Sequence, residues 1–420
     1  MDTRAQITRR FANRVTVDHT LKRQVVSYQG NKDQPGLRWM KYKEGFSRTL
    51  VERFIKERKP SSLLDPFSGL GTAPLVAAGH GISATGIEIM PVGVLAASGI
   101  AHTANGLDKE DLRDIGNEMV RRISCRKPAS RDFAFPHVAI TEKAFPKKTE
   151  AEIAKAREFV AGIKNPAYRS GRNLRANVDI GEIKSFPDAL KERLSDMVED
   201  IESVKENYGK CYPTFVTGSC LELLRKIPEG SYDLIVTSPP YANRYDYTRT
   251  YAIELAWLGF DQSGFRELRQ KMLSATVENK SKLEWLEGIY EDDLAKAGSM
   301  YAKQPVLNEV IEILNNRRGE LSNPHIIRLI EGYFFEMAVV ISEMARIVKP
   351  GGAVIMVNDN VQYHGEEIPV DFVLSDFAEQ VGFRCTNILK LPRGKGNSSQ
   401  QMATFGRREI RKCVYEWVKK

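Results

Sequence analysis

The segment from residue 62 to residue 90 restricts the possible folds more than any other part of the sequence. It reads SLLDPFSGLGTAPLVAAGHGISATGIEIM: an apolar strand ends at Asp65, a glycine-bearing loop follows, a helix closes on glycine, and a second strand ends near Glu88. A unit of strand, loop, helix and strand favours a parallel sheet, because the helix is the crossover that parallel strands need. We therefore predict an α/β fold.

The same alternation returns in two later parts of the chain, separated by charged stretches with helical periodicity. With 420 residues, 42% of them hydrophobic, the chain can form more than one compact unit. We predict five segments, namely the N-terminal segment with the first half of the sheet, a charged helical insertion, the second half of the sheet, another helical insertion, and the C-terminal part of the sheet with a basic tail: 1–107, 108–210, 211–260, 261–325 and 326–420.

The glycine loop predicts a nucleoside ligand. Gly69 and Gly71 permit tight backbone geometry and the close approach of a ligand. Glu88 has the position of the acidic residue that takes ribose hydroxyls in nucleotide-binding sheets. The spacing is neither G-x-G-x-x-G nor that of a P-loop, so an adenosine-bearing ligand without a pyrophosphate fits best. Taken alone, the loop is equally typical of a structural turn.

The strand at 232–237 ends in a rigid corner, Ser238-Pro239-Pro240-Tyr241. The two prolines fix φ and remove two N–H donors, and Ser238 is biased towards an extended conformation because a proline follows it. The corner therefore offers acceptors, which are backbone carbonyls and the Ser238 hydroxyl, beside the flat ring of Tyr241. Such a set suits a planar heterocycle with an exocyclic NH2 group, at the strand end where α/β sheets bind ligands.

Together, DPFSGLGT and TSPPY resemble the cofactor loop and the catalytic tetrapeptide of the S-adenosylmethionine-dependent amino-methyltransferases of DNA. The resemblance covers about residues 22–105, 212–260 and 326–420. It implies a class I, Rossmann-like methyltransferase fold with a mostly parallel seven-stranded sheet. One class of these enzymes has its target-recognition region where the insertion at 108–210 lies, and 261–325 is the alternative.

The resemblance also implies a role for each matched position. The catalytic residues would be Ser238, Pro239, Pro240 and Tyr241, with no metal. The cofactor S-adenosyl-L-methionine would be bound by Phe46, Ser47, Asp65, Pro66, Phe67, Ser68, Gly69, Gly71, Thr72, Glu88, Ser219, Cys220 and Thr237. Ser219 stands where the family often has an aspartate that meets the adenine amine, so Cys220 or a backbone carbonyl is the alternative partner of that amine.

The implied reaction is direct transfer of a methyl group to the exocyclic amine of a base flipped out of DNA. Ser238 and the Pro239 carbonyl would accept hydrogen bonds from the amine, and Tyr241 would stack on the base. A serine at the first position is most often associated with N4-cytosine methylation, whereas adenine enzymes more often have Asp or Asn. We expect a cytosine-N4-specific enzyme, with an N6-adenine enzyme, an RNA base methyltransferase and a non-catalytic cofactor-binding subunit as alternatives.

The charge distribution suits a polyanionic partner, and the resemblance implies that this partner is double-stranded DNA. The net charge is +8, and basic residues gather in TRRFANR, LKR, YRSGRNLR, LPRGKGN and GRREIRK. Arg244 and Tyr245 follow the corner closely enough to reach a flipped base. The other expected DNA contacts are Tyr168, Arg169, Arg172, Arg175, Arg393 and Lys395, with Arg407, Arg408 and Arg411 in the same C-terminal cluster.

The remaining composition makes several protein classes improbable. No run of about 18 apolar residues occurs, so no membrane span is expected, and the basic N-terminus lacks the apolar core of a signal peptide. Five scattered cysteines predict reduced thiols in a cytoplasmic protein, and the histidines lack zinc-ligand spacing. We expect a cytoplasmic modification enzyme of a restriction-modification or related defence system, with a cognate endonuclease as a further partner.

Overall fold

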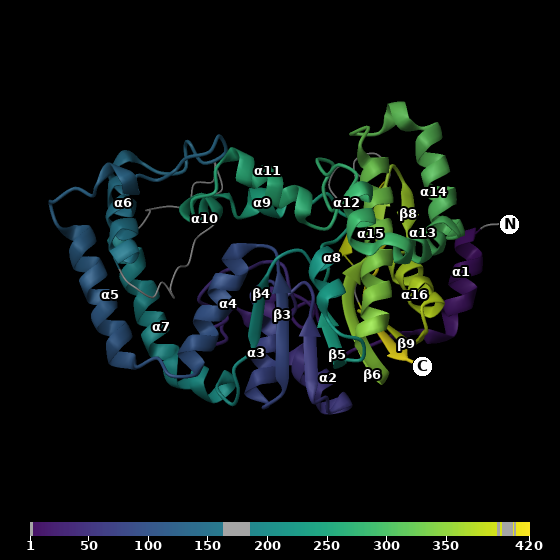
Figure 1. Cartoon of the computed structure of the whole chain (residues 1–420), viewed down its shortest axis with the longest axis horizontal. Helices are drawn as coiled ribbons and strands as arrows, with labels where there is room; N and C mark the ends of the chain where they lie inside the picture. The colour runs from purple at the N-terminus through teal and green to yellow at the C-terminus, as the bar shows by residue number, and fades with distance from the viewer. Residues whose placement is uncertain (1–2, 163–184, 393–394, 397–405, 407–408) are drawn as a thin grey trace.

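The computed structural model describes residues 3–162, 185–392, 395–396, 406 and 409–420. Within these residues eight strands form one central sheet in the order β1-β9-β12-β6-β5-β2-β3-β4 (Figure 1). All neighbouring strands are parallel except where β12 pairs with β6 and β9, to which it is antiparallel. The bounds of the strands are β1 Val15–Val17, β2 Ser62–Asp65, β3 Ser83–Glu88, β4 Thr214–Thr217, β5 Tyr232–Thr237, β6 Val348–Asp359, β9 Phe383–Lys390 and β12 Lys412–Lys419.

Helices cover both faces of this sheet (Figure 1). Successive side chains of a strand point to opposite faces, and the two faces here belong to different cores: Leu64 packs with α15 and α16, whereas Leu63 packs with α2 and α3. The α/β fold predicted from the sequence is therefore confirmed. The bounds of these helices are α2 Arg48–Arg58, α3 Thr72–Gly79, α4 Pro91–Ala104, α8 Cys220–Leu223, α15 Ile326–Ile347 and α16 Val370–Gln380.

The eighth strand was not predicted. The N-terminal helix α1 (Thr3–Phe11) leads into β1, which adds a parallel strand to the edge of the sheet beside β9. The basic stretch TRRFANR lies here, and two of its arginines form ion pairs within the protein: Arg10 with Asp376 and Glu379, and Arg14 with Glu379. These two arginines attach the N-terminal segment to α16. Their charges are therefore used within the protein, whereas the sequence pattern had placed them among the basic groups for a polyanionic partner.

The first insertion contains α5 (Lys109–Ser124), α6 (Lys147–Gly162) and α7 (Phe186–Tyr208), which form a group at the end of the molecule opposite the two termini (Figure 1). The C-terminal half of α7 also belongs to the body of the protein, because Ile201, Val204 and Tyr208 are fully buried in the core that contains α3 and α4. A buried carboxylate strengthens this junction, since Asp200 accepts hydrogen bonds from the Arg38 guanidinium and the Trp39 indole. The helical group is thus firmly joined to the sheet.

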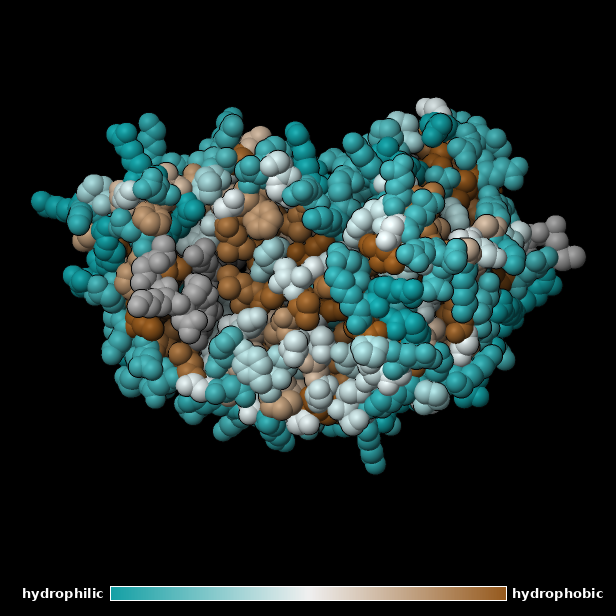
Figure 2. All heavy atoms as spheres, in the orientation of Figure 1, coloured by the Kyte–Doolittle hydropathy of each residue, from teal (hydrophilic) through white to brown (hydrophobic). Residues whose placement is uncertain are grey.

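Short helices follow the corner and continue into the second insertion. They are α9 Tyr247–Thr250, α10 Ala252–Trp257, α11 Gln262–Lys271, α12 Leu283–Tyr290, α13 Leu294–Ala302 and α14 Pro305–Asn316. Helices α9 to α11 lie between the α5–α7 group and α12 at the top of the view in Figure 1. Figure 2 shows hydrophobic side chains gathered below them, in the middle of this face.

A buried ion pair fixes the second insertion to α15. The Lys282 ammonium donates to Glu336 Oε1 at 2.8 Å and to the Ser274 hydroxyl at 2.6 Å, while the Ser274 N–H donates to Glu336 Oε2 at 2.7 Å. The side chains of Lys282 and Glu336 are 5% and 2% exposed. The loop between α11 and α12 is held at both of its ends by these contacts.

Removing one partner of this pair leaves a buried charge without compensation. We expect Lys282→Met to lower the free energy of unfolding by roughly 3–5 kcal/mol, as is usual when one member of a buried pair is lost. Chemical denaturation followed by circular dichroism measures this change. The matched control is Lys226→Met, because the Lys226–Glu222 pair lies at the surface, where such pairs contribute little; equal losses in the two variants would contradict the assignment.

Candidate active site

The reversal of strand order between β2 and β5 creates the candidate site. In parallel α/β sheets ligands bind at the carboxyl ends of the strands where the order reverses, and here Asp65 ends β2 while Thr237 ends β5. The Thr237 hydroxyl donates to Asp65 Oδ1 at 2.7 Å, and the Phe67 N–H donates to the same oxygen at 3.1 Å. The glycine loop and the Ser-Pro-Pro-Tyr corner therefore begin from two strand ends joined by a hydrogen bond.

Gly69 gives the glycine loop its shape. Its φ of +53° lies in the left-handed region, and a Cβ there would come within 2.8 Å of the Tyr42 ring. The Gly69 N–H donates to Glu88 Oε2 at 2.6 Å, and the Met90 N–H donates to Glu88 Oε1 at 2.7 Å. The carboxylate of Glu88 is thereby fixed at the end of β3 and lines a cavity beside the loop.

Both acids of this edge are buried, and burial changes their ionisation. Burial raises the pKa of Asp65 to about 7, against the hydrogen bonds from Thr237 and Phe67 that favour its charged form. Burial likewise raises the pKa of Glu88 to about 7, against hydrogen bonds from Met90 and Gly69. This edge of the sheet thus contains two carboxyl groups whose ionised forms a cationic ligand would favour.

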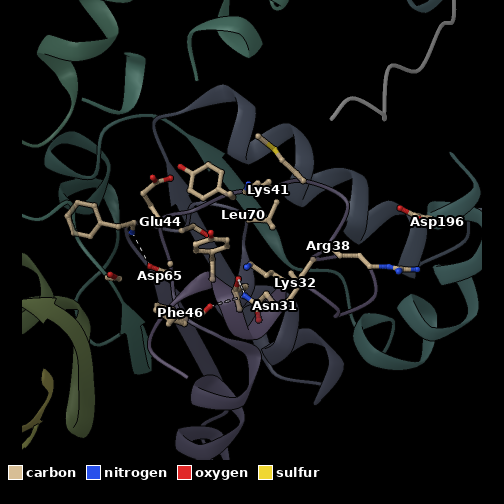
Figure 3. A pocket seen from close by; sticks show the side chains of 18 of the residues that line it. Asn31, Lys32, Arg38, Lys41, Glu44, Phe46, Asp65, Leu70 and Asp196 are labelled. Atoms are coloured by element: carbon tan, nitrogen blue, oxygen red, sulfur yellow. Dashed lines mark hydrogen bonds between the residues drawn. The ribbon is translucent and has the colours of Figure 1, made fainter. Parts of the chain in front are cut away.

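Three adjoining cavities meet at Ser238. The first has a volume of about 360 Å³ and lies beside Asp65, Ser68 and Phe46. Figure 3 shows Glu44 and Asp65 on one side of it and Arg38 and Asp196 on the other. The hydroxyl of Ser68 is buried without a hydrogen-bond partner among the described residues, which suits a polar ligand group.

The second cavity is the narrow one beside Glu88. Apolar side chains form much of its wall, including Ile89 and Met90 after β3 and Met272 and Leu273 from the second insertion. Ser274, the residue after Leu273, is hydrogen-bonded to both Lys282 and Glu336. The buried ion pair therefore holds the chain next to this wall in place. The narrow apolar slot with an acid at its end has the form expected for a nucleoside.

The third cavity has a volume of about 470 Å³ and contains the aromatic residue of the corner. The Lys412 ammonium, on β12, donates to the Tyr241 hydroxyl at 3.1 Å and forms an ion pair with Asp359 at 2.9 Å. Its nitrogen is 5.0 Å from the centre of the Tyr241 ring, so it lies nearer the hydroxyl than the ring centre. The Ser238 hydroxyl approaches the same Tyr241 oxygen at 3.4 Å.

Most residues predicted to contact the cofactor or the target line one of these cavities. They are Phe46, Asp65, Pro66, Phe67, Ser68, Gly69, Thr72, Glu88, Ser219, Cys220, Ser238, Pro239, Pro240, Tyr241 and Tyr245.

Four predicted residues are placed differently. The Ser47 hydroxyl donates to the Val25 carbonyl, and Thr237 is directed at Asp65. Gly71 is packed against Ala97 and Phe215 at the start of α3. Arg244 has a φ of +68° and donates to the Ser322 hydroxyl of the second insertion, so it stabilises the polypeptide beyond the corner instead of entering a cavity. Ser47, Gly71 and Thr237 support the site without lining it.

The adenine contact expected of Ser219, with Cys220 or a backbone carbonyl as the alternative, stays a prediction. Ser219 lines the second cavity. Its hydroxyl donates to the Lys271 carbonyl at 2.7 Å, because the second insertion approaches this point of the chain. The thiol of Cys220 is buried, and burial raises its pKa, so it is a neutral wall of the cavity. Neither side chain takes the place of a carboxylate.

The predicted DNA contacts are mostly untested by the structure. Tyr168, Arg169, Arg172, Arg175, Arg393, Arg407 and Arg408 lie outside the described residues, and for Lys395 only the backbone of a two-residue strand is described. Arg411 is placed differently from the expectation, since its guanidinium donates to both oxygens of the buried Asp371 at 2.9 and 3.0 Å. That pair joins the residue before β12 to α16.

Several residues that line the cavities were not predicted, and the polar ones nearest the corner include Tyr42, Glu44, Asp359 and Lys412. Tyr42 and Glu44 stand four and two residues before Phe46, which was predicted to bind the cofactor, so that prediction was the available signal. Asp359 and Lys412 end and begin neighbouring antiparallel strands, and nothing in the local sequence indicates that they meet.

Several negative findings concern the described residues. Within them no helix is long and apolar enough to cross a membrane. No cluster of three potential metal ligands occurs in the same part of the chain. The five cysteines are free thiols, at positions 125, 211, 220, 385 and 413.

A glycine loop, an acid after the next strand and a Ser-Pro-Pro-Tyr corner at the switch point of a mostly parallel sheet define a class I methyltransferase. Known proteins agree. The type II methyltransferase M.AvaI, from Nostoc sp. (strain PCC 7120 / SAG 25.82 / UTEX 2576), is 38% identical over 460 aligned residues, which cover 98% of this chain and 92% of that protein. The type II methyltransferase M.BsoBI from Geobacillus stearothermophilus is 36% identical and covers 99% and 92%.

The chain therefore belongs to the type II methyltransferases, a family of DNA methyltransferases. No protein-family model matches it. Two solved structures, TrmN from Thermus thermophilus and the antibiotic-resistance methyltransferase Kmr, align over 89% and 90% of this chain and 49% and 95% of their own. Their TM-scores are both 0.26, at 10% and 11% identity, so the fold assignment depends on the strand order and not on these alignments.

Proposed function

We propose that the protein transfers a methyl group from S-adenosyl-L-methionine to the exocyclic N4 amine of a flipped cytosine in double-stranded DNA. The observation that carries this proposal is the meeting of three cavities at Ser238, two beside the glycine loop and one beside Tyr241. A reaction between two ligands requires both to reach one point, and Ser238 borders every one of the three spaces.

The residues at the two cavities of the glycine loop fit S-adenosyl-L-methionine. Both hydrogen bonds that Asp65 accepts reach Oδ1, so Oδ2 can accept from the ammonium of the methionine moiety. Glu88 can accept from ribose hydroxyls, and the unpartnered Ser68 hydroxyl supports a polar group nearby. The wall of Ile89, Met90, Met272 and Leu273 suits the adenine ring.

When bound, this cofactor supplies a methyl group activated by the neighbouring sulfonium. The chain aligns the acceptor with it: Ser238 and the Pro239 carbonyl accept hydrogen bonds from the target amine, so its nitrogen lone pair is directed towards the methyl donor. A base inside a duplex cannot enter the third cavity, so it must be flipped out, which costs a few kcal/mol. Stacking on Tyr241, whose hydroxyl is held by Lys412, offsets part of that cost.

The choice of cytosine depends on the serine at the first position of the corner. The proposal is tested by incubating the protein with methyl-labelled S-adenosyl-L-methionine and unmodified bacterial DNA, followed by digestion to nucleosides and mass spectrometry. Labelled N4-methylcytosine is the expected product. Labelled N6-methyladenine would retain the enzyme class and overturn the base, and label in RNA alone would overturn the DNA substrate.

The names of the relatives support a place in a restriction-modification system. Type II methyltransferases M.AvaI and M.BsoBI are similar over nearly the whole chain. We propose that this protein likewise protects DNA from a cognate restriction endonuclease. The insertion at 108–210 is the proposed target-recognition region, and 261–325 is the alternative.

The raised pKa values of Asp65 and Glu88 make cofactor binding dependent on pH. Both lie at about 7, so each group is partly protonated at neutral pH and is ionised when it receives a cation or a hydroxyl donor. We expect binding of S-adenosylhomocysteine to release protons near pH 7 and to weaken as the pH falls below 7. Calorimetry in buffers of different ionisation enthalpy measures this release.

The same two groups affect the stability of the unliganded protein, with the opposite sign from a salt-bridged acid. Their folded pKa values lie above the unfolded ones, 3.8 for Asp65 and 4.5 for Glu88, so their ionisation destabilises the fold as the pH rises towards 7. The double variant with Asp65→Asn and Glu88→Gln removes both effects. Proton release that is unchanged in this variant would contradict the assignment.

A further inference from the structure

Glu44 occupies the point where the three cavities meet. Among the described residues, Glu44 and Ser238 are the two that line all three. In the proposed function Ser238 orients the target amine, but neither its hydroxyl nor the Pro239 carbonyl is basic enough to retain a proton. A carboxylate at this point can take up a proton, which the groups that orient the amine cannot do.

The surroundings of Glu44 hold its carboxylate in a fixed position. The Tyr251 hydroxyl donates to Glu44 Oε2. The ring of Tyr251 stacks on that of Tyr42, with centroids 4.8 Å apart and an angle of 14° between the planes. The Lys43 N–H donates to the Tyr251 oxygen at 3.1 Å, so the backbone beside Glu44 also positions its hydrogen-bond donor.

The electrostatic environment makes Glu44 a stronger base than an exposed glutamate. Burial raises its pKa, and the hydrogen bonds from Tyr251 and Tyr245 oppose this effect. The other carboxylate of the third cavity, Asp359, is in an ion pair with Lys412. The titratable groups that face Glu44 are Tyr42, Lys43, Glu88, Tyr245, Tyr247 and Tyr251.

We propose that Glu44 is the proton acceptor of the reaction. This inference rests on the proposed function. As the N–C bond forms, the C–S bond breaks with its electron pair left on sulfur, and the nitrogen carries one proton too many. Glu44 takes that proton as an N–H bond breaks and a carboxyl O–H bond forms, and the proton then passes to solvent. The product is the neutral methylated amine, and the enzyme is restored.

The test compares Glu44→Gln with the wild-type protein at saturating cofactor and DNA. A glutamine has the same shape and its carbonyl oxygen can accept from Tyr251, but it cannot take a proton. We expect the single-turnover rate of methyl transfer to fall about 10²- to 10⁴-fold, the range typical of general base catalysis, while the Kd of S-adenosylhomocysteine stays within about twofold of wild type by calorimetry. Glu44→Asp should recover part of the rate.

The matched control is Glu254→Gln. Glu254 is partly buried like Glu44, and burial raises its pKa to about 7, but it lies on α10 and lines none of the three cavities. It should transfer methyl groups at the wild-type rate. A rate of Glu44→Gln close to wild type would overturn the inference, and so would a loss of rate accompanied by an equal loss of cofactor binding, since the role would then be structural.

A second readout does not depend on activity. With glutamate labelled by ¹³C at the side-chain carboxyl, one resonance should be absent in Glu44→Gln, titrate above the ordinary glutamate pKa in the wild type and shift when S-adenosylhomocysteine binds. The rate of the wild type should fall as acid protonates this group. Titration at the ordinary pKa would overturn the inference while DNA methylation still stood; a wild-type protein that methylates no nucleic acid would overturn both.

Discussion

Replacing Ser238 with alanine should lower the rate of methyl transfer by on the order of 10²-fold or more while cofactor still binds. Ser238 borders all three cavities and approaches the Tyr241 hydroxyl, and in the proposed function its oxygen accepts from the reacting amine. A preorganised hydrogen bond at the reacting centre typically contributes a factor of this size. Single-turnover transfer to DNA and calorimetric binding of S-adenosylhomocysteine separate the two quantities.

The control for Ser238 is another partly buried serine. The Ser342 hydroxyl donates to the Ala338 carbonyl of its own helix, far from the corner in the sequence and outside the cavities. Ser342→Ala should leave the rate unchanged. A Ser238→Ala protein that transfers methyl groups as fast as the control would refute the role of the corner.

The ring of Tyr241 and its hydroxyl can be tested separately. Tyr241→Ala removes the stacking surface, which is worth about 1–3 kcal/mol for a base in other proteins, and should nearly abolish transfer. Tyr241→Phe retains the ring and should keep much of the activity, with a loss that reflects the broken contact to Lys412.

Glu88→Ala should weaken cofactor binding by on the order of 10²-fold or more. A hydrogen bond to a charged group contributes roughly 1.5–3 kcal/mol, and a ribose offers two hydroxyls to this carboxylate. The backbone N–H groups of Gly69 and Met90 also lose their acceptor, so the loop is loosened at the same time. The Kd of S-adenosylhomocysteine measures the effect.

Glu254→Ala serves as the comparison for Glu88→Ala, because it removes a partly buried glutamate outside the cavities. Both variants should lose stability, and only the change at Glu88 should raise the Kd strongly. If the two variants bound the ligand equally well, Glu88 would have no part in the cofactor site.

The features that could be predicted from sequence share a local origin. The strand that ends at Asp65 and the strand that ends at Thr237 both read as short apolar runs closed by turn residues, and parallel strands bring their carboxyl ends to one edge. That rule alone places the glycine loop beside the Ser-Pro-Pro-Tyr corner. The alternation of Leu63 and Leu64 between two cores follows from the same period of two.

The features that were missed depend on contacts between distant parts of the chain. β1 has three residues, too few for a periodic pattern, and its partner Ile388 lies near the other end of the sequence. Lys412 reaches Tyr241 because β12 runs antiparallel beside β6. The Ser219 hydroxyl donates to the Lys271 carbonyl only because the second insertion folds over this edge of the sheet.

The central claim is that cofactor and target meet at Ser238, and the crystal structure of the complex with S-adenosylhomocysteine tests it most directly. We predict that the ribose lies on Glu88, the methionine ammonium on Asp65 and the sulfur between Glu44 and Ser238, and that the cavity beside Tyr241 is left for the base. A ligand whose adenosyl group occupied the cavity beside Tyr241, or whose sulfur lay away from Ser238, would contradict it.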